Sequence, residues 1–140
     1  MAAYLLDTNV ISCIIKKQAD TQRINDKLRS LLKQNALILI SPIVFYELAR
    51  LLYERQAKKQ LAFLEELVAC FEWIDLQRPT WTLAAQFWAN CRKKGTPTGD
   101  GTEGLDADAL IAAQAEEHKA VVVTNNIRHF QYLGVNYESW

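Results

Sequence analysis

The sequence predicts one α/β domain over residues 1–140, with three layers and a mostly parallel central sheet between helices. Four short apolar runs carry this prediction, because they do not alternate with polar residues. Such runs are typical of strands that are covered on both faces, as in a parallel sheet. They lie at residues 3–6, 36–40, 73–76 and 120–123. Segments with helical periodicity separate them, so the chain alternates between strands and helices.

The helical segments carry apolar side chains three and four residues apart. Three such stripes are Leu28, Leu31 and Leu32; Leu61, Leu64, Leu67, Val68 and Phe71; and Trp81, Ala84, Ala85 and Trp88. Ser41 followed by Pro42 predicts a helix start, because serine caps the first turn and proline has no amide to satisfy. That helix runs to about Tyr53. Another helix, from Asp106 to about His118, follows the turn-rich residues 95–104.

The charges balance overall but are segregated along the chain. The sequence has 16 basic and 16 acidic residues, which argues against a protein whose whole surface binds nucleic acid. Residues 14–60 hold ten Lys or Arg and four Asp or Glu, whereas residues 61–140 hold six and eleven. A basic face and an acidic site would explain this pattern, and so would solvated helix surfaces. The basic face would comprise Lys16, Lys17, Arg23, Lys27, Arg29 and Lys33.

Cysteine usage and hydropathy predict a cytoplasmic protein. The three cysteines are odd in number and lack CxxC spacing, so we expect reduced thiols. The first apolar stretch, residues 2–6, is too short for a signal peptide and ends at Asp7. No later stretch approaches the length of a membrane span. We therefore expect no contact with a membrane.

Polar side chains follow the first and the last predicted strand. Asp7, Thr8 and Asn9 come directly after the first, and residues 124–126, Thr-Asn-Asn, come after the last. The carboxyl ends of parallel strands meet at one edge of a sheet, where open α/β folds place their functional crevice. We therefore expect these side chains to lie together. For Asp7 the alternative is a simple N-cap of the next helix.

Glu47 interrupts an otherwise apolar helical stripe. Its neighbours on that stripe are Val44, Leu48 and Leu51, so the carboxylate is expected to face inward. A buried carboxylate is costly unless it is paired, protonated or bound to a cation. Pairing with Lys or Arg is the simple alternative to a functional role.

Two acidic residues open the alanine-rich helix, and they point in different directions. Asp108 shares a face with Ile111, Ala112 and Ala115 and is expected to point inward. Asp106 is about 200° away around the helix and is better placed to cap it. A negative charge in the first turn is also favourable by itself, which is the alternative explanation for Asp108.

Three inward carboxylates on separate segments repel one another unless a cation lies between them. Carboxylate and carbonyl oxygens favour Mg²⁺ or Mn²⁺, which can promote phosphodiester hydrolysis. Zinc has little support, because the only histidines are His118 and His129 and neither an HExxH motif nor paired cysteines are present.

Four stretches, in this order, resemble the motifs of PIN-domain ribonucleases, most closely the VapC-like toxins of toxin–antitoxin pairs. They are residues 4–12 (YLLDTNVIS), 41–48 (SPIVFYEL), 108–115 (DALIAAQA) and 121–130 (VVVTNNIRHF), and the likeness extends to residues 134–140. The resemblance implies a three-layer PIN-like fold. It also implies a Mg²⁺- or Mn²⁺-dependent endoribonuclease that activates water without a covalent intermediate.

The resemblance also assigns roles to single residues. It places Asp7, Glu47 and Asp108 at the catalytic, metal-binding positions and Asn126 beside the metal. Thr124 helps to hold the site. The remaining supporting polar residues are Thr8, Asn9 and Ser41, of which Asn9 and Ser41 orient the carboxylates. We further expect Asp7 and Asp108 to bridge the metal and Glu47 to support the activated water.

The expected partners follow from the same resemblance: an RNA substrate, a second copy in a homodimer, and a small antitoxin whose basic or apolar tail occupies the acidic cleft.

Two features depart from the family pattern. His129 stands where many members have Asp, which weakens the case for a second metal. Residues 98–104 form a longer loop than usual before the third acidic position, either near the substrate path or as a simple surface insertion.

Two other functions compete with the nuclease. A phosphohydrolase with an aspartate nucleophile, of the haloacid dehalogenase kind, would use Asp7, but that chemistry needs a second carboxylate two residues later. Asn9 stands there instead. A PIN-like module that binds RNA or protein without catalysis becomes more attractive if His129 reflects decay of the site. Three inward carboxylates argue against it, because an inactive site has no need of them.

Overall fold

The computed structural model describes residues 2–94 and 105–140. Within these ranges it contains a five-stranded sheet and seven helices. The strands are β1 (Ala3–Leu6), β2 (Leu37–Ile40), β3 (Glu72–Trp73), β4 (Val121–Val123) and β5 (Tyr137–Glu138). The helices are α1 (Thr8–Ile15), α2 (Thr21–Lys33), α3 (Pro42–Glu54), α4 (Lys58–Cys70), α5 (Arg78–Lys93), α6 (Leu105–His118) and α7 (Ile127–Leu133).

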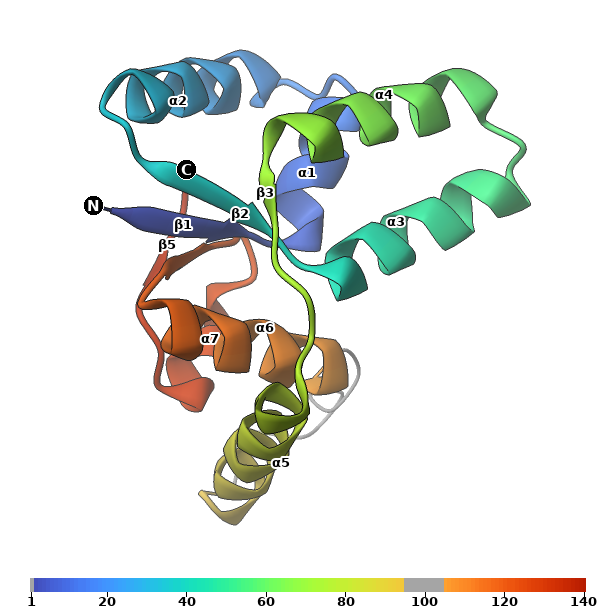
Figure 1. Cartoon of the computed structure of the whole chain (residues 1–140). Coiled ribbons are helices and arrows are strands. Elements are labelled where there is room, and N and C mark those ends of the chain that lie inside the picture. The colour runs from blue at the N-terminus through green and yellow to red at the C-terminus, as the bar shows by residue number, and fades with distance from the viewer. Residues whose placement is uncertain (1, 95–104) are drawn as a thin grey trace.

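The sheet has the order β3-β2-β1-β4-β5, and every pairing is parallel. The chain builds outward from β1 to β3 and then crosses back to β4 on the other side of β1. Figure 1 shows α1 to α4 on one side of the sheet and α5 to α7 on the other. The predicted α/β fold with a parallel sheet is thus confirmed. Its topological switch point lies between β1 and β4, where open α/β sheets bind ligands.

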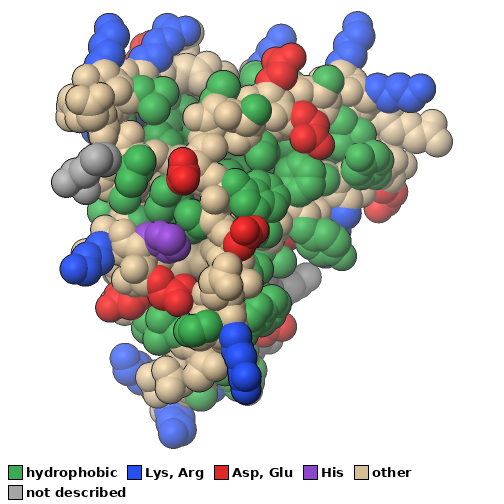
Figure 2. Space-filling view, viewed as in Figure 1, with side chains coloured by type: hydrophobic (Ala, Val, Ile, Leu, Met, Phe, Trp, Pro, Cys, Tyr) green, Lys and Arg blue, Asp and Glu red, His purple; other side chains and the backbone are tan. Residues whose placement is uncertain are grey.

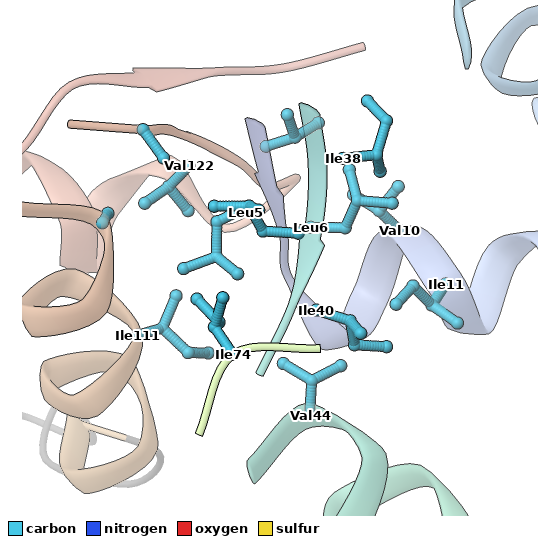
Figure 3. Packing of buried hydrophobic residues seen from close by; sticks show 14 of the residues in the cluster. Leu5, Leu6, Val10, Ile11, Ile38, Ile40, Val44, Ile74, Ile111 and Val122 are labelled. Atoms are coloured by element: carbon cyan, nitrogen blue, oxygen red, sulfur yellow. The ribbon is translucent and has the colours of Figure 1, made fainter. Parts of the chain in front are cut away.

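Both faces of the sheet are covered, which explains why the strand sequences do not alternate. Leu5 and Leu6 of β1 are both fully buried although they point to opposite faces. Figure 3 shows Leu5 beside Ile111 of α6 and Leu6 toward Val10 of α1. The central strand is therefore enclosed in the core, and Asp7, the residue that follows it, is buried as well.

The strand predictions hold for β1, β2 and β4 to within one residue, but two parts of the sheet differ. β3 is shorter and earlier than predicted: the Ile74 amide still donates to the Ile40 carbonyl of β2 at 3.1 Å, but the carbonyls of Ile74 and Asp75 accept from Gln114 Nε2 at 2.9 and 3.4 Å instead of continuing the ladder. β5 was not predicted, since its two residues form no apolar run. It pairs with β4 at the edge of the sheet.

The predicted apolar stripes of two helices were partly wrong. Leu32 is 48% exposed, so α2 is buried through Leu28 and Leu31 together with an earlier turn. Trp81 and Trp88 of α5 are exposed, whereas Thr80, Ala84 and Cys91 are buried. The reason is that α5 packs against α6 and α7, which demands small side chains at the contact.

Two further expectations concern the loop and the membrane. Residues 98–104 lie outside the described residues, so their relation to the site stays a prediction. Among the helices that the structure describes, none combines the length and hydropathy of a membrane span.

Candidate active site

A cleft opens where β1 and β4 end, and it collects residues from four separate segments. Figure 2 shows a histidine with acidic side chains near it on this face of the molecule, whereas most Lys and Arg side chains stand at the outline of the molecule. The cleft is lined by Asp7, Thr8, Asn9, Ser12, Glu47, Leu48, Leu51, Asp108, Asn126 and His129. All three predicted catalytic carboxylates therefore line one cleft at the predicted edge of the sheet.

Asp7 is 4% exposed and is held by hydrogen bonds on both carboxylate oxygens. Oδ1 accepts from the Thr8 amide at 2.7 Å, and Oδ2 accepts from the Thr124 hydroxyl at 2.7 Å. Asp7 is also the N-cap of α1, so the same side chain both caps this helix and lines the cleft. Burial raises the pKa of Asp7, against the opposing effect of these two hydrogen bonds, and the nearby charge of Glu47 raises it further.

Asp108 points inward from the first turn of α6, as predicted, and is 8% exposed. Burial, followed by repulsion from Asp7, raises the pKa of the Asp108 carboxyl to about 7, although the contact with His129 opposes this rise. Asp106 is exposed. It lies inside the first turn of α6 rather than at the expected capping position, because the described helix already begins at Leu105.

Glu47 reaches the same cleft from α3 and is only half-buried. The Thr8 hydroxyl donates to Glu47 Oε1 at 2.9 Å. The salt bridges found in the described part of the chain involve other residues, so pairing with Lys or Arg does not account for this carboxylate. The stripe that carries it is less deeply buried than predicted, because Leu51 is 43% exposed along the cleft wall.

Thr124 joins the two central strand ends. Its fully buried hydroxyl donates to Asp7 and accepts from the Asn126 amide at 2.9 Å. Asn9 makes a second link, because its Oδ1 accepts from the Asn125 amide at 3.0 Å. Its Nδ2 lies 3.4 Å from Oδ2 of Asp7. These contacts fix the orientation of Asp7, in agreement with the supporting roles expected of Asn9 and Thr124.

Ser41 and Asn126 are placed differently from the carboxylates. Ser41 is buried at the start of α3, where its Oγ accepts from the Ile43 amide at 3.3 Å. It does not line the cleft, and its expected role in orienting a carboxylate stays a prediction. Asn126 lines the cleft but is exposed, and its Nδ2 lies 3.5 Å from Nδ1 of His129. Its predicted role beside a metal stays a prediction.

The comparison with protein families agrees with this geometry. The family model described as the PIN domain matches residues 4–135, which is nearly the whole chain. This chain belongs to the PIN-domain family. Its relatives include the "tRNA(fMet)-specific endonuclease VapC" of Salmonella typhimurium, which is 30% identical over 100% of this chain and 99% of the relative. "Ribonuclease VapC2" of Rickettsia felis is 30% identical over 98% of this chain and 97% of the relative.

Solved structures resemble this PIN domain over the same length. VapBC2 from Rickettsia felis, bound to a DNA fragment from its promoter, matches with a TM-score of 0.83 and 28% identity over 99% of this chain and 98% of the other. DNA-bound VapBC from Salmonella typhimurium has a TM-score of 0.77 and 28% identity over 100% and 99%. The predicted PIN-like fold and the likeness to VapC proteins are confirmed.

His129 is the cleft residue whose part in this PIN domain the sequence did not reveal. Its Nδ1 lies 2.5 Å from Oδ2 of Asp108, and both side chains are 12% exposed. In the sequence His129 stands out only as a departure from the family pattern. Its contact with Asp108 is not visible there, because 21 residues separate the two. The packing of α7 against α6 brings the two together.

The donor set of this PIN domain fits a hard divalent cation. No three His, Cys, Asp or Glu side chains within residues 2–94 and 105–140 converge closely enough to bind one ion together. Mg²⁺ in proteins commonly uses one or two carboxylates and keeps several waters. Asp7 and Asp108 match that pattern. Burial raises the pKa of both carboxyls, and the charge of Asp7 raises the pKa of Asp108 further. A bound cation would offset both effects, because it stabilises the ionised carboxylates.

Proposed function

We propose that this PIN domain is a Mg²⁺- or Mn²⁺-dependent endoribonuclease and the toxin of a VapBC-type toxin–antitoxin pair. The observation that carries the proposal is the convergence of Asp7 and Asp108, both buried, with Glu47 at the switch point of the sheet. The names of the VapC relatives support RNA as the substrate. An RNA-cleaving toxin would act in the cytoplasm.

In the proposed mechanism, Asp7 and Asp108 are the residues that would hold a divalent cation. When bound, such an ion stabilises charge on the phosphoryl oxygens and makes water nucleophilic near neutral pH. Thr124 and the Thr8 amide keep Asp7 in one orientation. Glu47 has Oε1 occupied by the Thr8 hydroxyl, which leaves its other oxygen to orient the attacking water. The water attacks in line with the leaving oxygen, and no bond to the protein forms.

Cleavage of RNA tests this proposal directly. We expect the purified protein to cut a total bacterial RNA pool at discrete sites in Mg²⁺ or Mn²⁺, and not in EDTA. The product ends are mapped by sequencing, with tRNA(fMet) inspected first because the Salmonella relative is named for it. The matched control is Asp7→Asn, which keeps a good N-cap for α1 while it removes the charge. Equal cutting by this variant would contradict the proposal.

The aspartate-nucleophile alternative makes a different prediction. That chemistry needs a proton donor two residues after the nucleophile, where Asn9 instead contacts Asp7 and the Asn125 amide. We therefore expect beryllium fluoride, which mimics an aspartyl phosphate, to leave Asp7 unmodified. Fluorine NMR in the presence of Mg²⁺ is the measurement. A bound fluoroberyllate signal that Asp7→Asn abolishes would favour the phosphohydrolase over the nuclease.

The proposed antitoxin has a suitable surface beside the cleft. An apolar groove between α1 and α3 is lined by Ser12, Ile15, Lys16, Leu48, Leu51, Leu52 and Arg55. It shares Ser12, Leu48 and Leu51 with the acidic cleft, so the two are continuous. An antitoxin segment with apolar side chains in the groove and a basic side chain in the cleft would cover both. The solved VapBC structures support a partner of this kind.

Toxicity in cells provides the corresponding test. We expect induced expression of the chain alone to arrest the growth of a bacterial host, because unopposed RNA cleavage stops translation. The same amount of the Asp7→Asn protein, checked by immunoblot, should permit normal growth. Growth curves and viable counts are the measurements. Arrest of equal depth by both proteins would argue for a binding module rather than an enzyme.

The homodimer expected from the family is also a proposal. Trp81 and Trp88 of α5 are exposed beside a shallow cleft that Ala109 and Leu110 of α6 help to line. Exposed aromatic side chains around small residues are typical of protein interfaces. This face of α5 and α6 is available to a second copy of the chain.

A further inference from the structure

The contact between His129 and Asp108 differs from the other ion pairs of the described chain. The pairs Arg23 with Asp20 and Arg29 with Asp26 lie on or beside α2 with more than half of each side chain exposed. His129 and Asp108 join two different helices in the wall of the cleft, and each is 12% exposed. A shielded contact of this kind holds its geometry better than a surface pair does. It therefore constrains how Asp108 presents its oxygens.

The ring of His129 occupies one oxygen of Asp108. A carboxylate accepts hydrogen bonds or ions on two oxygens, and Nδ1 lies 2.5 Å from Oδ2. This distance requires a proton between the two atoms, which either Nδ1 or the carboxyl group donates. Oδ2 is thereby satisfied within the protein. Each carboxylate oxygen has two lone pairs, as the hydrogen-bonded oxygens of Asp7 also do, so Oδ1 is simply the oxygen of Asp108 that the ring does not engage.

The same ring separates Asp108 from the polar groups that follow β4. Nδ1 of His129 lies 2.5 Å from Asp108 and 3.5 Å from Nδ2 of Asn126. A second cation held by both Asp108 and Asn126 would have to occupy the space that this ring fills. The Asp7 and Asp108 carboxylates are close enough that Asp7 repels the charge of Asp108.

We infer that His129 is a positioning residue, which directs one oxygen of Asp108 toward Asp7 and restricts the cleft to a single divalent ion per chain. This inference rests on the proposed metal-dependent function. It extends that function by stating how many ions the cleft takes and which side chain sets the number. The restriction arises from hydrogen bonding and occupied space, so it applies to Mg²⁺ and Mn²⁺ alike.

Counting bound Mn²⁺ tests the inference without an assay of activity. Isothermal titration calorimetry and electron paramagnetic resonance give the number of ions per chain for the wild type and two variants. We expect one ion for the wild type and one for His129→Asn, whose amide also donates to Asp108. We expect two ions for His129→Asp, which replaces the donor by a carboxylate. An acidic residue early in α7 is favourable for the helix, so this variant should fold.

Each result decides a separate point. Two ions in the wild type, or one ion in a folded His129→Asp protein, would overturn the inference while the metal-dependent nuclease stands. Absence of Mn²⁺ binding in all three proteins, together with no metal-dependent cleavage, would overturn the proposed function and the inference with it. Nitrogen NMR of histidine in the wild type needs no His129 variant. The Nδ1 resonance of His129 is expected to shift in Asp108→Asn, and an unchanged resonance would contradict the contact.

Discussion

Replacing Asp108 by Asn should lower RNA cleavage by about a thousand-fold or more, equivalent to roughly 4 kcal/mol of transition-state stabilisation. Asp108 is one of two buried carboxylates that line the cleft at the switch point of the sheet. An amide keeps the shape of the side chain but removes the charge that attracts a cation. Single-turnover cleavage rates at saturating Mn²⁺ measure the effect, and Mn²⁺ titration shows whether affinity or chemistry is lost.

The helix itself provides a matched control for this variant. Asp106 lies two residues earlier on α6 and is exposed, so Asp106→Asn changes the charge of the protein equally. We expect its cleavage rate to stay within about a factor of two of the wild type, because a solvated surface charge has little effect at this range. Comparable losses in both variants would indicate a general electrostatic effect. Activity of Asp108→Asn within tenfold of the wild type would remove Asp108 from the site.

Sequence periodicity located Asp7 and Asp108 because each lies in or directly beside a regular element whose burial its sequence shows. Asp108 falls on the buried face of a helix, and Asp7 directly follows a strand that is buried on both faces. The parallel topology then brings Asp7 and Thr124 together, since Leu6 pairs with Val123 one residue earlier. These parts of the site depend on local patterns and on one rule about sheet edges, and both can be recognised in a single sequence.

Other features were missed because they depend on contacts between distant segments. The apolar face of α5 was misassigned because its buried positions are Thr80, Ala84 and Cys91, whereas both tryptophans stay exposed at the edge of α6. The contact of His129 with Asp108 requires the packing of α7 on α6, which periodicity does not specify. The early end of β3 involves the buried Gln114, whose amide takes the carbonyls of residues 74 and 75. Such interactions leave no periodic signal in the sequence.

The metal-free protein should lose thermal stability as the pH rises from about 4 to about 8, because Asp108 must ionise in a buried position. The pKa of Asp108 is about 7 in the folded protein, against 3.8 for the free side chain. Between these values the folded protein binds more protons than the unfolded chain does. The stabilisation is therefore complete below the lower value and is lost as the pH passes the upper one. Asp7, whose pKa is also raised, acts in the same direction.

Thermal denaturation in EDTA at several pH values measures this loss, which should reach several kcal/mol, or roughly 10 °C in Tm. The decisive quantity is the difference between the wild type and Asp108→Asn, since other carboxylates titrate in both. We expect the variant to be the more stable protein at pH 8 and the difference to shrink toward pH 4. Mn²⁺ should reverse the trend for the wild type, because the ion binds ionised carboxylates and stabilises the folded state more as the pH rises. Parallel curves for the two proteins in EDTA would show that Asp108 ionises in the folded protein without cost, and the electrostatic reason for a cation at this position would then be lost.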